Sequence, residues 1–482
     1  ERLSGHRFRT RSDTEVILHL YEEMGPECVR ELDGMFAFAI WDTKRRTLFA
    51  ARDRLGKKPF VYWHEGEKFR FASELGALDA PRKLDRAALE RYLAFGYIPA
   101  PWTIYEGVKK LPPGHTLEFD GASVQLKKYW EPRLEPVEGS EDEYAERLVA
   151  ALTRAVRKRL QADVPVGAFL SGGLDSSIVA GLMSQMGPTR TFSIGFQEEQ
   201  FNEIAFAREA AKQFRTDHRE FEVRPDAVEI LPRLLGNFGE PFGDTSAVPT
   251  YCVARETAKH VKVALSGDGG DELFLGYRRY AAMAGAARLR RWPAPLVAAG
   301  AVALRPWRTN YGERVRRILA SSNAPLGEIY AGLVGVFTPS MRRALGMAGD
   351  PAVEGIVAAA FTGREGDAAS AAGLSDLATY LPYDILAKVD ITSMANGLEV
   401  RCPFLDREVV DLALRMPTRL RMGKRVVRRA FRGLLPKSVL ERPKQGFGLP
   451  MAEWLRGKLR PLLEDATSSL EKRGLLEGAE IG

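Results

Sequence analysis

Short apolar segments alternate with longer amphipathic ones through the middle of the chain, and this alternation limits the fold more than any other feature. The apolar segments predict strands at 166–170, 191–196, 218–223 and 261–265, and the stretches between them predict helices. Strands that alternate with helices form right-handed crossovers around a parallel sheet. We therefore expect an α/β doubly wound parallel sheet, followed from about residue 278 by a mainly helical C-terminal part.

The first 130 residues follow a different pattern. Ser12 and Glu15 have the spacing of a capping box before an amphipathic helix. Residues 35–42 and 47–53 then alternate with a period of two, as the strands of a hairpin do. The domain boundaries that this change of pattern predicts are 1–131 for a layered α+β domain, 132–142 for a linker and 143–482 for the α/β domain.

Composition excludes several classes of protein. The 482 residues are 45% apolar with a formal net charge of +7, so the chain is too hydrophobic and too weakly charged for a disordered protein. Cys28, Cys252 and Cys402 are too far apart for a disulfide framework or a Cys-x-x-Cys zinc site, which favours a reducing, cytoplasmic location. The longest apolar run, at 295–304, is about half of the ~20 residues that a membrane span needs, so we expect no membrane contact.

Two basic tracts leave alternatives open. Residues 278–319 hold ten arginines and one acidic residue, and residues 415–444 hold eleven lysines and arginines and one acidic residue. Such tracts can bind a nucleic acid, an anionic membrane or a polyphosphate, or they can be solvated helix faces. Because neither tract has interleaved aromatic residues, we do not expect nucleic-acid binding.

Residues 171–177 (SGGLDSS) come directly after a predicted strand and directly before a predicted helix. Glycines there allow successive N–H groups to face one point, and the helix N-terminus adds its partial positive charge, so the segment predicts an anion cradle. Asp175 would repel a phosphate unless Mg²⁺ lies between them. An ordinary strand-to-helix turn capped by Ser and Asp is the alternative, although capping does not explain the paired glycines.

A second loop repeats this chemistry. Residues 261–272 (VKVALSGDGGDE) place Ser-Gly and acidic residues at the end of another predicted strand. Ligands of open parallel sheets lie at the carboxyl ends of the strands, so we expect both loops to flank one crevice. Asp175 and Asp271 could then share Mg²⁺ on ATP, with Lys388 and Lys444 among the cations that meet the phosphate charge.

Four motifs in order resemble the glutamine-dependent asparagine synthetase family. They lie at 171–177, at 265–272 (LSGDGGDE), at 388–406 (KVDITSMANGLEVRCPFLD) and at 442–447 (RPKQGF). The first matches the signature of PP-loop ATP pyrophosphatases, which cleave ATP between the α- and β-phosphates. Segments at 12–18, 34–40 and 52–56 resemble the second half of the family's N-terminal glutaminase domain, which is an Ntn-hydrolase with αββα layers, incomplete in this chain.

The resemblance implies a ligase that amidates a carboxylate, expected to be aspartate, through an acyl-AMP intermediate. Ammonia would come from glutamine in the full-length enzyme. The cofactors implied are ATP and Mg²⁺, with Asp175 and Asp271 as metal ligands. The implied ATP-binding residues are Phe169, Leu170, Ser171, Gly172, Gly173, Asp175, Ser176, Ile194, Ser266 and Gly267.

The resemblance implies catalytic roles for two residues. Lys444 would neutralise charge on the α-phosphoryl group as it transfers, an interaction that is stronger in the transition state. Asp268 stands where many asparagine-forming members carry Glu, the residue linked to formation of the acyl-adenylate. A bacterial subfamily that resembles this chain also reads SGDGGDE, and the shorter acid leaves the identity of the acceptor open.

Three further residues have two interpretations each. Glu399 and Arg401 could bind the charged groups of the acceptor, or they could pack in a helical core. Asp13 would correspond to the residue that pairs with the α-ammonium of glutamine, or it could simply favour the dipole of its helix.

The glutaminase nucleophile of the family is an N-terminal Cys whose free amine serves as base. Glu1 cannot take this role, and Cys28 lies inside the chain without a free amine. We therefore do not expect the glutaminase half-reaction from this chain as given. A record truncated at the N-terminus is the favoured explanation, and a natural form limited to ammonia is the other.

Other functions remain as alternatives. An amidotransferase of the same fold could act on another carboxylate, such as a cell-surface polysaccharide precursor. RNA binding and a non-catalytic scaffold are less favoured, because the residues of the phosphate loops are intact. The expected partners are therefore small molecules, with no nucleic acid and no membrane, and a homodimer is left open.

Overall fold

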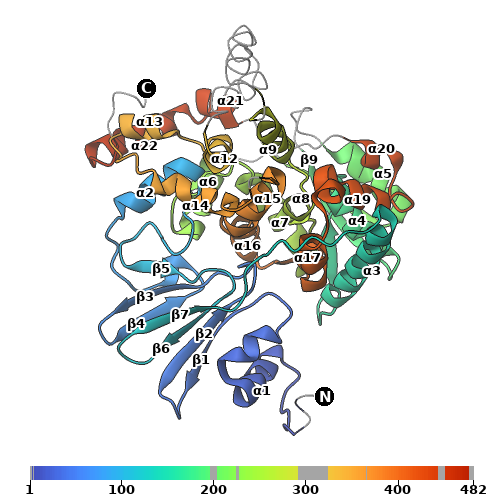
Figure 1. Ribbon diagram of the computed structural model, residues 1–482, viewed down its shortest axis with the longest axis horizontal. Coiled ribbons are helices and arrows are strands. Elements are labelled where there is room, and N and C mark those ends of the chain that lie inside the picture. Colours follow the sequence, from blue (N-terminus) through green and yellow to red (C-terminus); the bar gives the residue numbers. More distant parts are fainter. Residues whose placement is uncertain are drawn as a thin grey trace. The chain divides into compact units, whose positions relative to one another are not determined.

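The chain divides into two compact units, which are described separately (Figure 1). The computed structural model describes residues 3, 5–195, 203–223, 227–290, 292, 324–364, 366–442 and 451–476. The first unit comprises Glu1–Asp85, Pro99–Glu131 and Phe238–Glu240, and the second comprises Arg86–Ile98, Pro132–Asn237 and Pro241–Gly482. Residues 86–98 therefore belong to the second unit and residues 238–240 to the first, which the sequence pattern did not indicate.

The first unit contains two antiparallel sheets. The strands of the larger sheet lie in the order β1 (Ala37–Asp42), β2 (Thr47–Arg52), β6 (His115–Phe119) and β7 (Val124–Lys128). Those of the smaller sheet lie in the order β4 (Lys68–Ala72), β3 (Val61–Glu65) and β5 (Val108–Lys110). The expected hairpin is confirmed, because β1 and β2 pair antiparallel from Ala37 opposite Arg52 to Asp42 opposite Thr47.

Alternate residues of β2 are buried on opposite faces of the larger sheet. Phe49 and Ala51 pack in a core with the helical segments α1 (Asp13–Met24) and η1 (Gly25–Arg30). Ala50 packs instead with Tyr62 of the smaller sheet. Helices, one sheet and a second sheet are therefore stacked in layers, as the period of two predicts for a strand buried on both faces. The remaining short helix of this unit is η2 (Leu75–Ala77).

Helix α1 begins where the sequence predicts, although its cap differs from a capping box. Ser12 is the N-cap, and its hydroxyl oxygen accepts from the N–H of Thr14 at 3.2 Å. The Glu15 carboxylate accepts from the backbone N–H groups of Arg9 and Thr10, at 2.7 and 2.6 Å. Glu15 therefore holds the segment before the helix against the first turn.

The second unit is built on a five-stranded parallel sheet, which confirms the predicted α/β architecture. The order is β10 (Asp217–Glu222), β9 (Arg190–Gly195), β8 (Val166–Phe169), β11 (Val263–Leu265) and β12 (Glu399–Arg401). Each neighbouring pair is parallel. The chain moves outward from β8 to β10 and then returns to the other side of β8 as β11. The strand order therefore reverses between β8 and β11, which is the switch point of the sheet.

Helices cover the sheet. The connecting helices are α4 (Leu174–Ser184), α5 (Ile204–Phe214), α6 (Ala227–Phe238) and α7 (Ala247–Ala258). Helix α4 packs on β8 and α5 on β9, whereas α7 and α16 (Leu386–Met394) share a buried core with β11 and β12. Right-handed crossovers require this change of face where the chain reverses direction.

Helix α3 (Glu141–Arg159) precedes the sheet and starts inside the predicted linker. Ser140 caps it by accepting from the N–H of Glu143 at 3.1 Å, and the first turn is acidic while the last is basic, as the helix dipole favours. Tyr144, Leu148, Leu152 and Val156 recur every four residues, as the apolar stripe of a buried helix does. Each of them is 1% exposed or less.

The other elements of the second unit are mostly helices, as the sequence predicts after residue 278. The α-helices are α2 (Arg86–Phe95), α8 (Gly270–Leu273), α9 (Arg278–Leu289), α12 (Leu326–Val334), α13 (Pro339–Ala344), α14 (Ala352–Ala358), α15 (Ala368–Ala378), α17 (Arg407–Leu414), α18 (Thr418–Arg421), α19 (Arg425–Ala430), α20 (Lys437–Glu441), α21 (Met451–Arg456) and α22 (Arg460–Lys472). The shorter turns are η4 (Ala359–Phe361), the π-helical η5 (Leu381–Ile385), η6 (Pro403–Leu405) and η7 (Met422–Lys424). Among the helices described, none combines the length and the apolar character that a bilayer crossing requires.

A buried carboxylate joins three of these helices. Asp376 of α15 accepts from the guanidinium of Arg279 on α9, at 2.7 and 3.0 Å. It also accepts from the hydroxyls of Tyr280 and Tyr330, at 2.5 and 2.6 Å. Asp376 is 2% exposed, so water cannot solvate its charge. The carboxylate is stabilised by these donors instead, and the donors have the carboxylate as their acceptor.

We expect replacement of Asp376 by alanine to lower the stability of the protein by about 3 kcal/mol, because the Arg279 charge and two tyrosine hydroxyls lose their acceptor. The midpoint of urea unfolding, followed by tryptophan fluorescence of the full chain, measures the effect. Asp142→Ala is the matched control, because it removes a carboxylate that is exposed and whose pair with Arg429 contributes little to stability. Equal midpoints for the two variants would contradict the prediction.

Candidate active site

A cavity of about 420 Å³ lies in the second unit where β8, β9 and β11 end. This volume is in the range of small-molecule sites. The residues that sequence analysis proposed and that line it are Phe169, Leu170, Ser171, Gly173, Asp175, Ser176, Ile194, Ser266, Gly267, Asp268, Asp271 and Lys388. The structure therefore brings both predicted loops to one crevice at the switch point of the sheet, where open α/β folds bind ligands.

The first loop is held in shape by its own serines. The Ser176 hydroxyl accepts from the N–H of Ser171 at 3.3 Å and donates to the carbonyl of Gly173 at 3.2 Å. Gly172 does not line the cavity but has φ +70°, and an added Cβ would lie 2.6 Å from the backbone nitrogen of Ala207. Gly172 therefore fits only as glycine, and it turns the chain into the N-terminus of α4.

The second loop approaches the first so closely that side chains are excluded between them. A Cβ added to Gly267 would lie 2.7 Å from the Cβ of Asp175 and 2.8 Å from the backbone nitrogen of Ser176. The hydroxyl of Ser266 donates to Asp268 at 2.7 Å, which fixes that carboxylate beside the loop. Glycine at 267 thus allows the two loops to form one surface.

Lys424 joins the two loops, and sequence analysis did not single it out. Its ammonium group lies 2.7 Å from Asp271 Oδ1 and also donates to Asp175 Oδ2. The backbone of Lys424 is left-handed, with φ +60°, and its N–H bonds the carbonyl of Phe274 at 3.0 Å. The lysine therefore reaches the acids from a turn that is itself attached behind the second loop.

A second lysine lies on another part of the cavity wall. The Lys388 ammonium group donates to Asp244 at 2.5 Å and to the hydroxyl of Ser246 at 2.7 Å. Burial alone would raise the pKa of Asp244, but the Lys388 charge and hydrogen bonds lower that pKa to about 2. Burial, followed by the Asp244 charge, holds the pKa of nearby Asp384 well above its usual value, so the two acids share one negative charge.

Glu272 adds a carboxyl group that changes charge near neutral pH. Burial, followed by the neighbouring Asp271 charge, raises its pKa to about 7. The Tyr277 hydroxyl donates to Glu272 at 2.6 Å. Tyr277 and Tyr380 both line the cavity, and Arg279 of the Asp376 cluster lies 4.3 and 4.5 Å from the centres of their rings.

The charged groups of the cavity are mixed in sign. Its acidic side chains are Asp175, Glu203, Asp244, Asp268, Asp271 and Glu272, and its basic ones are Lys388, Lys424, Arg428 and Arg442. Arg442 is held by Glu203 at 2.6 Å and lies over the ring of Phe206. Because the acids outnumber the bases, a bound polyphosphate would require further cationic charge. The carboxylates of Asp175 and Asp271 supply oxygen ligands, the type that Mg²⁺ prefers.

Three other candidates, Glu399, Arg401 and Asp13, are not among the residues that line this cavity. Glu399 and Arg401 lie on β12 and pair with each other at 2.7 Å, and the Arg401 guanidinium also donates to the carbonyls of Arg159 and Gln161 at 2.8 Å. The two residues therefore lie on a strand and not in a helical core, and their binding of the acceptor stays a prediction. Asp13 lies in the first turn of α1, in the first unit, and Lys444 lies outside the described residues.

Comparisons with known proteins agree with this geometry. Residues 147–481 match the family model for asparagine synthase, and residues 1–130 match the model for a glutamine amidotransferase domain. Asparagine synthetase [glutamine-hydrolyzing] 1 of Bacillus subtilis is 34% identical over 475 residues, which cover 94% of this chain and 74% of that protein. A putative asparagine synthetase [glutamine-hydrolyzing] of Mycobacterium tuberculosis is 36% identical over 473 residues, covering 94% and 72%.

A third relative matches over a shorter region. The putative asparagine synthetase [glutamine-hydrolyzing] 2 of Methanocaldococcus jannaschii is 42% identical over 281 residues, which cover 56% of this chain and 54% of that protein. The two family models together span nearly the whole sequence, and the longer matches do so as well. The chain therefore belongs to the glutamine-hydrolysing asparagine synthetase family of ligases.

Proposed function

We propose that the second unit uses ATP to activate a carboxylate, aspartate in the simplest case, as an acyl-adenylate that ammonia converts to the amide. The observation that carries this proposal is the meeting of two strand-end loops around the Lys424 ammonium group at the cavity. Both loops come from neighbouring strands at the switch point, and both supply a carboxylate to the same cation. A nucleotide with several phosphates is the ligand that such a loop, helix N-terminus and cation suit best.

The proposed reaction has two steps. A carboxylate oxygen of the acceptor attacks the α-phosphorus of ATP, and the bond from this phosphorus to the oxygen bridging to the β-phosphate breaks, which releases pyrophosphate. Ammonia then attacks the acyl carbon and loses a proton, and AMP leaves as the amide forms. Because negative charge gathers on the departing pyrophosphate, cations fixed around it would lower the barrier of the first step.

The first loop would bind the nucleotide. The backbone from Ser171 to Ser176 and the N-terminus of α4 would hold the pyrophosphate, and the strand-end residues Phe169, Leu170 and Ile194 would contact the adenine. Gly172 would act by shaping the turn, since its backbone packs on α5. Ser266 and Gly267 of the second loop would contact the AMP part.

Each charged residue would have its own role in the phosphate chemistry. Asp175 and Asp271 would hold Mg²⁺, which when bound neutralises charge on the leaving pyrophosphate. Lys424 is positioned by the same acids and would add a second positive charge there. Lys444, proposed from the sequence, would act on the α-phosphoryl group, and Asp268 would lie beside the reacting carboxylate, held by Ser266.

The acceptor would bind on the wall formed by Asp244 and Lys388. This pair presents one negative and one positive group within 2.5 Å of each other, which matches the α-ammonium and a carboxylate of an amino acid. For the first unit we propose an incomplete glutaminase domain of the Ntn-hydrolase type, in which Asp13 would pair with the glutamine ammonium. Its stacked helix and sheet layers support that proposal. Because Glu1 cannot supply the nucleophile, glutamine hydrolysis is not expected from this chain as given.

The acceptor is tested directly with an ammonium salt as the nitrogen source, so that the result does not depend on glutamine hydrolysis. We expect the chain to form asparagine, AMP and pyrophosphate in equal amounts from aspartate, ATP and Mg²⁺. Glutamate in place of aspartate is the control. Pyrophosphate release that does not require aspartate would contradict aspartate as acceptor and direct the search to other carboxylates, including polysaccharide precursors.

We expect Lys424→Met to slow pyrophosphate release by about 100-fold or more, because a fixed positive charge beside the leaving group is lost. Steady-state release at saturating ATP and aspartate measures this loss. Lys437→Met is the control, since that lysine is exposed and pairs with Glu441 one helical turn away. If Lys424→Met keeps a rate within about threefold of the unmodified chain and folds normally, the lysine is structural only.

The pKa of Glu272 leads to a prediction about pH. The carboxyl group is neutral below its pKa of about 7 and becomes an anion beside Asp271 above it. A polyanion should therefore bind more weakly as the pH rises, and we expect KM for MgATP to increase several-fold from about pH 6 to about pH 8. In Glu272→Gln, which stays neutral, KM should change much less. Parallel curves for both proteins would exclude Glu272 as the group responsible.

A further inference from the structure

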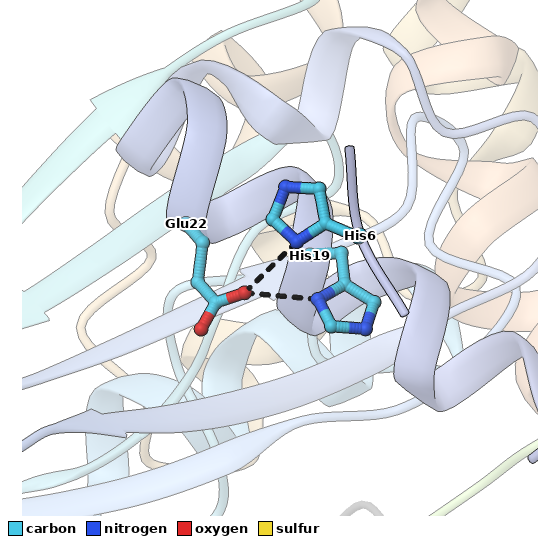
Figure 2. Close-up of side chains that lie close together, drawn as sticks. All are labelled: His6, His19 and Glu22. Carbon is cyan, nitrogen blue, oxygen red and sulfur yellow. Dashed lines mark hydrogen bonds and ion pairs between the residues drawn. The ribbon is translucent and has the colours of Figure 1, made fainter. Parts of the chain in front are cut away.

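Two histidines and a glutamate meet beside helix α1 in the first unit. His19 and Glu22 lie one turn apart on the helix, and His6 comes from the segment that precedes it. Figure 2 shows one nitrogen of each imidazole turned toward the same oxygen of Glu22. One potential ligand atom from each residue lies within 4.8 Å of the other two.

The separations of these atoms are those of a metal site. Glu22 Oε2 lies 2.9 Å from His19 Nδ1 and 3.5 Å from His6 Nδ1. Ligands placed tetrahedrally at 2.0–2.1 Å from an ion such as Zn²⁺ are about 3.3 Å from each other. Small side-chain rotations are therefore enough for all three atoms to contact one ion.

The outer nitrogens of the two rings also face carboxylates. His6 Nε2 lies 2.7 Å from Glu23 Oε1, and His19 Nε2 lies 3.6 Å from Glu15 Oε1. A carboxylate on the far nitrogen of a metal-bound imidazole fixes the ring and makes it a stronger ligand. The rings are already confined, because their side chains are 19% and 17% exposed and their centres lie 4.5 Å apart.

The segment that carries His6 is held in place by contacts other than those of the His6 ring itself. The Glu15 carboxylate accepts from the N–H groups of Arg9 and Thr10, and the ring of Phe8 packs edge-on against His19 at 4.8 Å between centres. The site is therefore largely formed before any ion binds, which reduces the entropy lost on binding.

We propose that His6, His19 and Glu22 bind a divalent transition-metal ion of the Zn²⁺ type, with water completing its coordination. Two imidazole nitrogens and one carboxylate oxygen suit Zn²⁺, Co²⁺ or Ni²⁺, whereas Mg²⁺ and Ca²⁺ prefer oxygen alone. The three nearby carboxylates, Glu15, Glu22 and Glu23, also favour a cation between the rings. The ion would fasten the segment around His6 to helix α1.

The test uses the full chain without a polyhistidine tag, in a buffer with excess Mg²⁺. Zn²⁺ is titrated in competition with a chromogenic chelator, and Co²⁺ is added separately to record the visible absorption of a tetrahedral site. We expect one ion per chain, and a loss of affinity of about tenfold or more in both His6→Ala and His19→Ala. His64→Ala is the control. His64 belongs to strand β3, and its Nε2 lies 2.7 Å from the carbonyl oxygen of Gly66.

We expect His6→Ala to fold normally, because His6 precedes the helix and its replacement leaves the Glu15 contacts intact. Far-UV circular dichroism checks the fold, and Zn²⁺ should raise the melting temperature of the unmodified chain but not that of His6→Ala. Equal Zn²⁺ affinities in the unmodified chain and in the His6→Ala/His19→Ala double variant would overturn the proposal. The histidines would then serve only as partners of the glutamates.

Discussion

The contact of the Lys424 ammonium group with Asp175 and Asp271 is the interaction on which the proposed active site depends. Without a cation between them, two carboxylates from two loops would repel each other in a mostly buried cavity, and the loops could not approach to the distance that Gly267 allows. The lysine is placed by backbone bonds behind the second loop. One side chain thus connects the sheet's switch point, the phosphate loop and the helical part that follows residue 278.

Much of the fold could be predicted because its signals are local. The strands of the parallel sheet from β8 to β11, the hairpin of β1 and β2, and the stripe of α3 each follow from a repeat that can be read in the sequence. Strand β12 could not, because it has only three residues and two of them are charged. The assignment of residues 86–98 to the second unit depends on packing, for which no local pattern exists.

The candidate site divides in the same way. The glycines and acids of the two loops were recognisable, because close backbone approach and phosphate chemistry restrict residue types at fixed spacing. Lys424 and Asp244 were not singled out, since they reach the cavity from turns far away in sequence and no neighbouring residue marks them. Glu399 and Arg401 were proposed for the acceptor from their charge. In the structure they lie two residues apart on β12, where they pair with each other, and Arg401 also bonds a carbonyl at the end of α3.

Three buried ion pairs of the second unit follow one rule. Lys424 with two acids, Lys388 with Asp244, and Arg279 with Asp376 each place a cation against carboxylates at or behind the cavity wall. Such pairs contribute little net stability, because desolvation offsets most of their attraction. Their benefit is fixed orientation in a site of low dielectric constant, where charge that develops during a reaction is stabilised without reorganisation of the protein. Apolar packing could replace them at equal stability, but it would leave the cavity without groups able to bind phosphate or an amino acid.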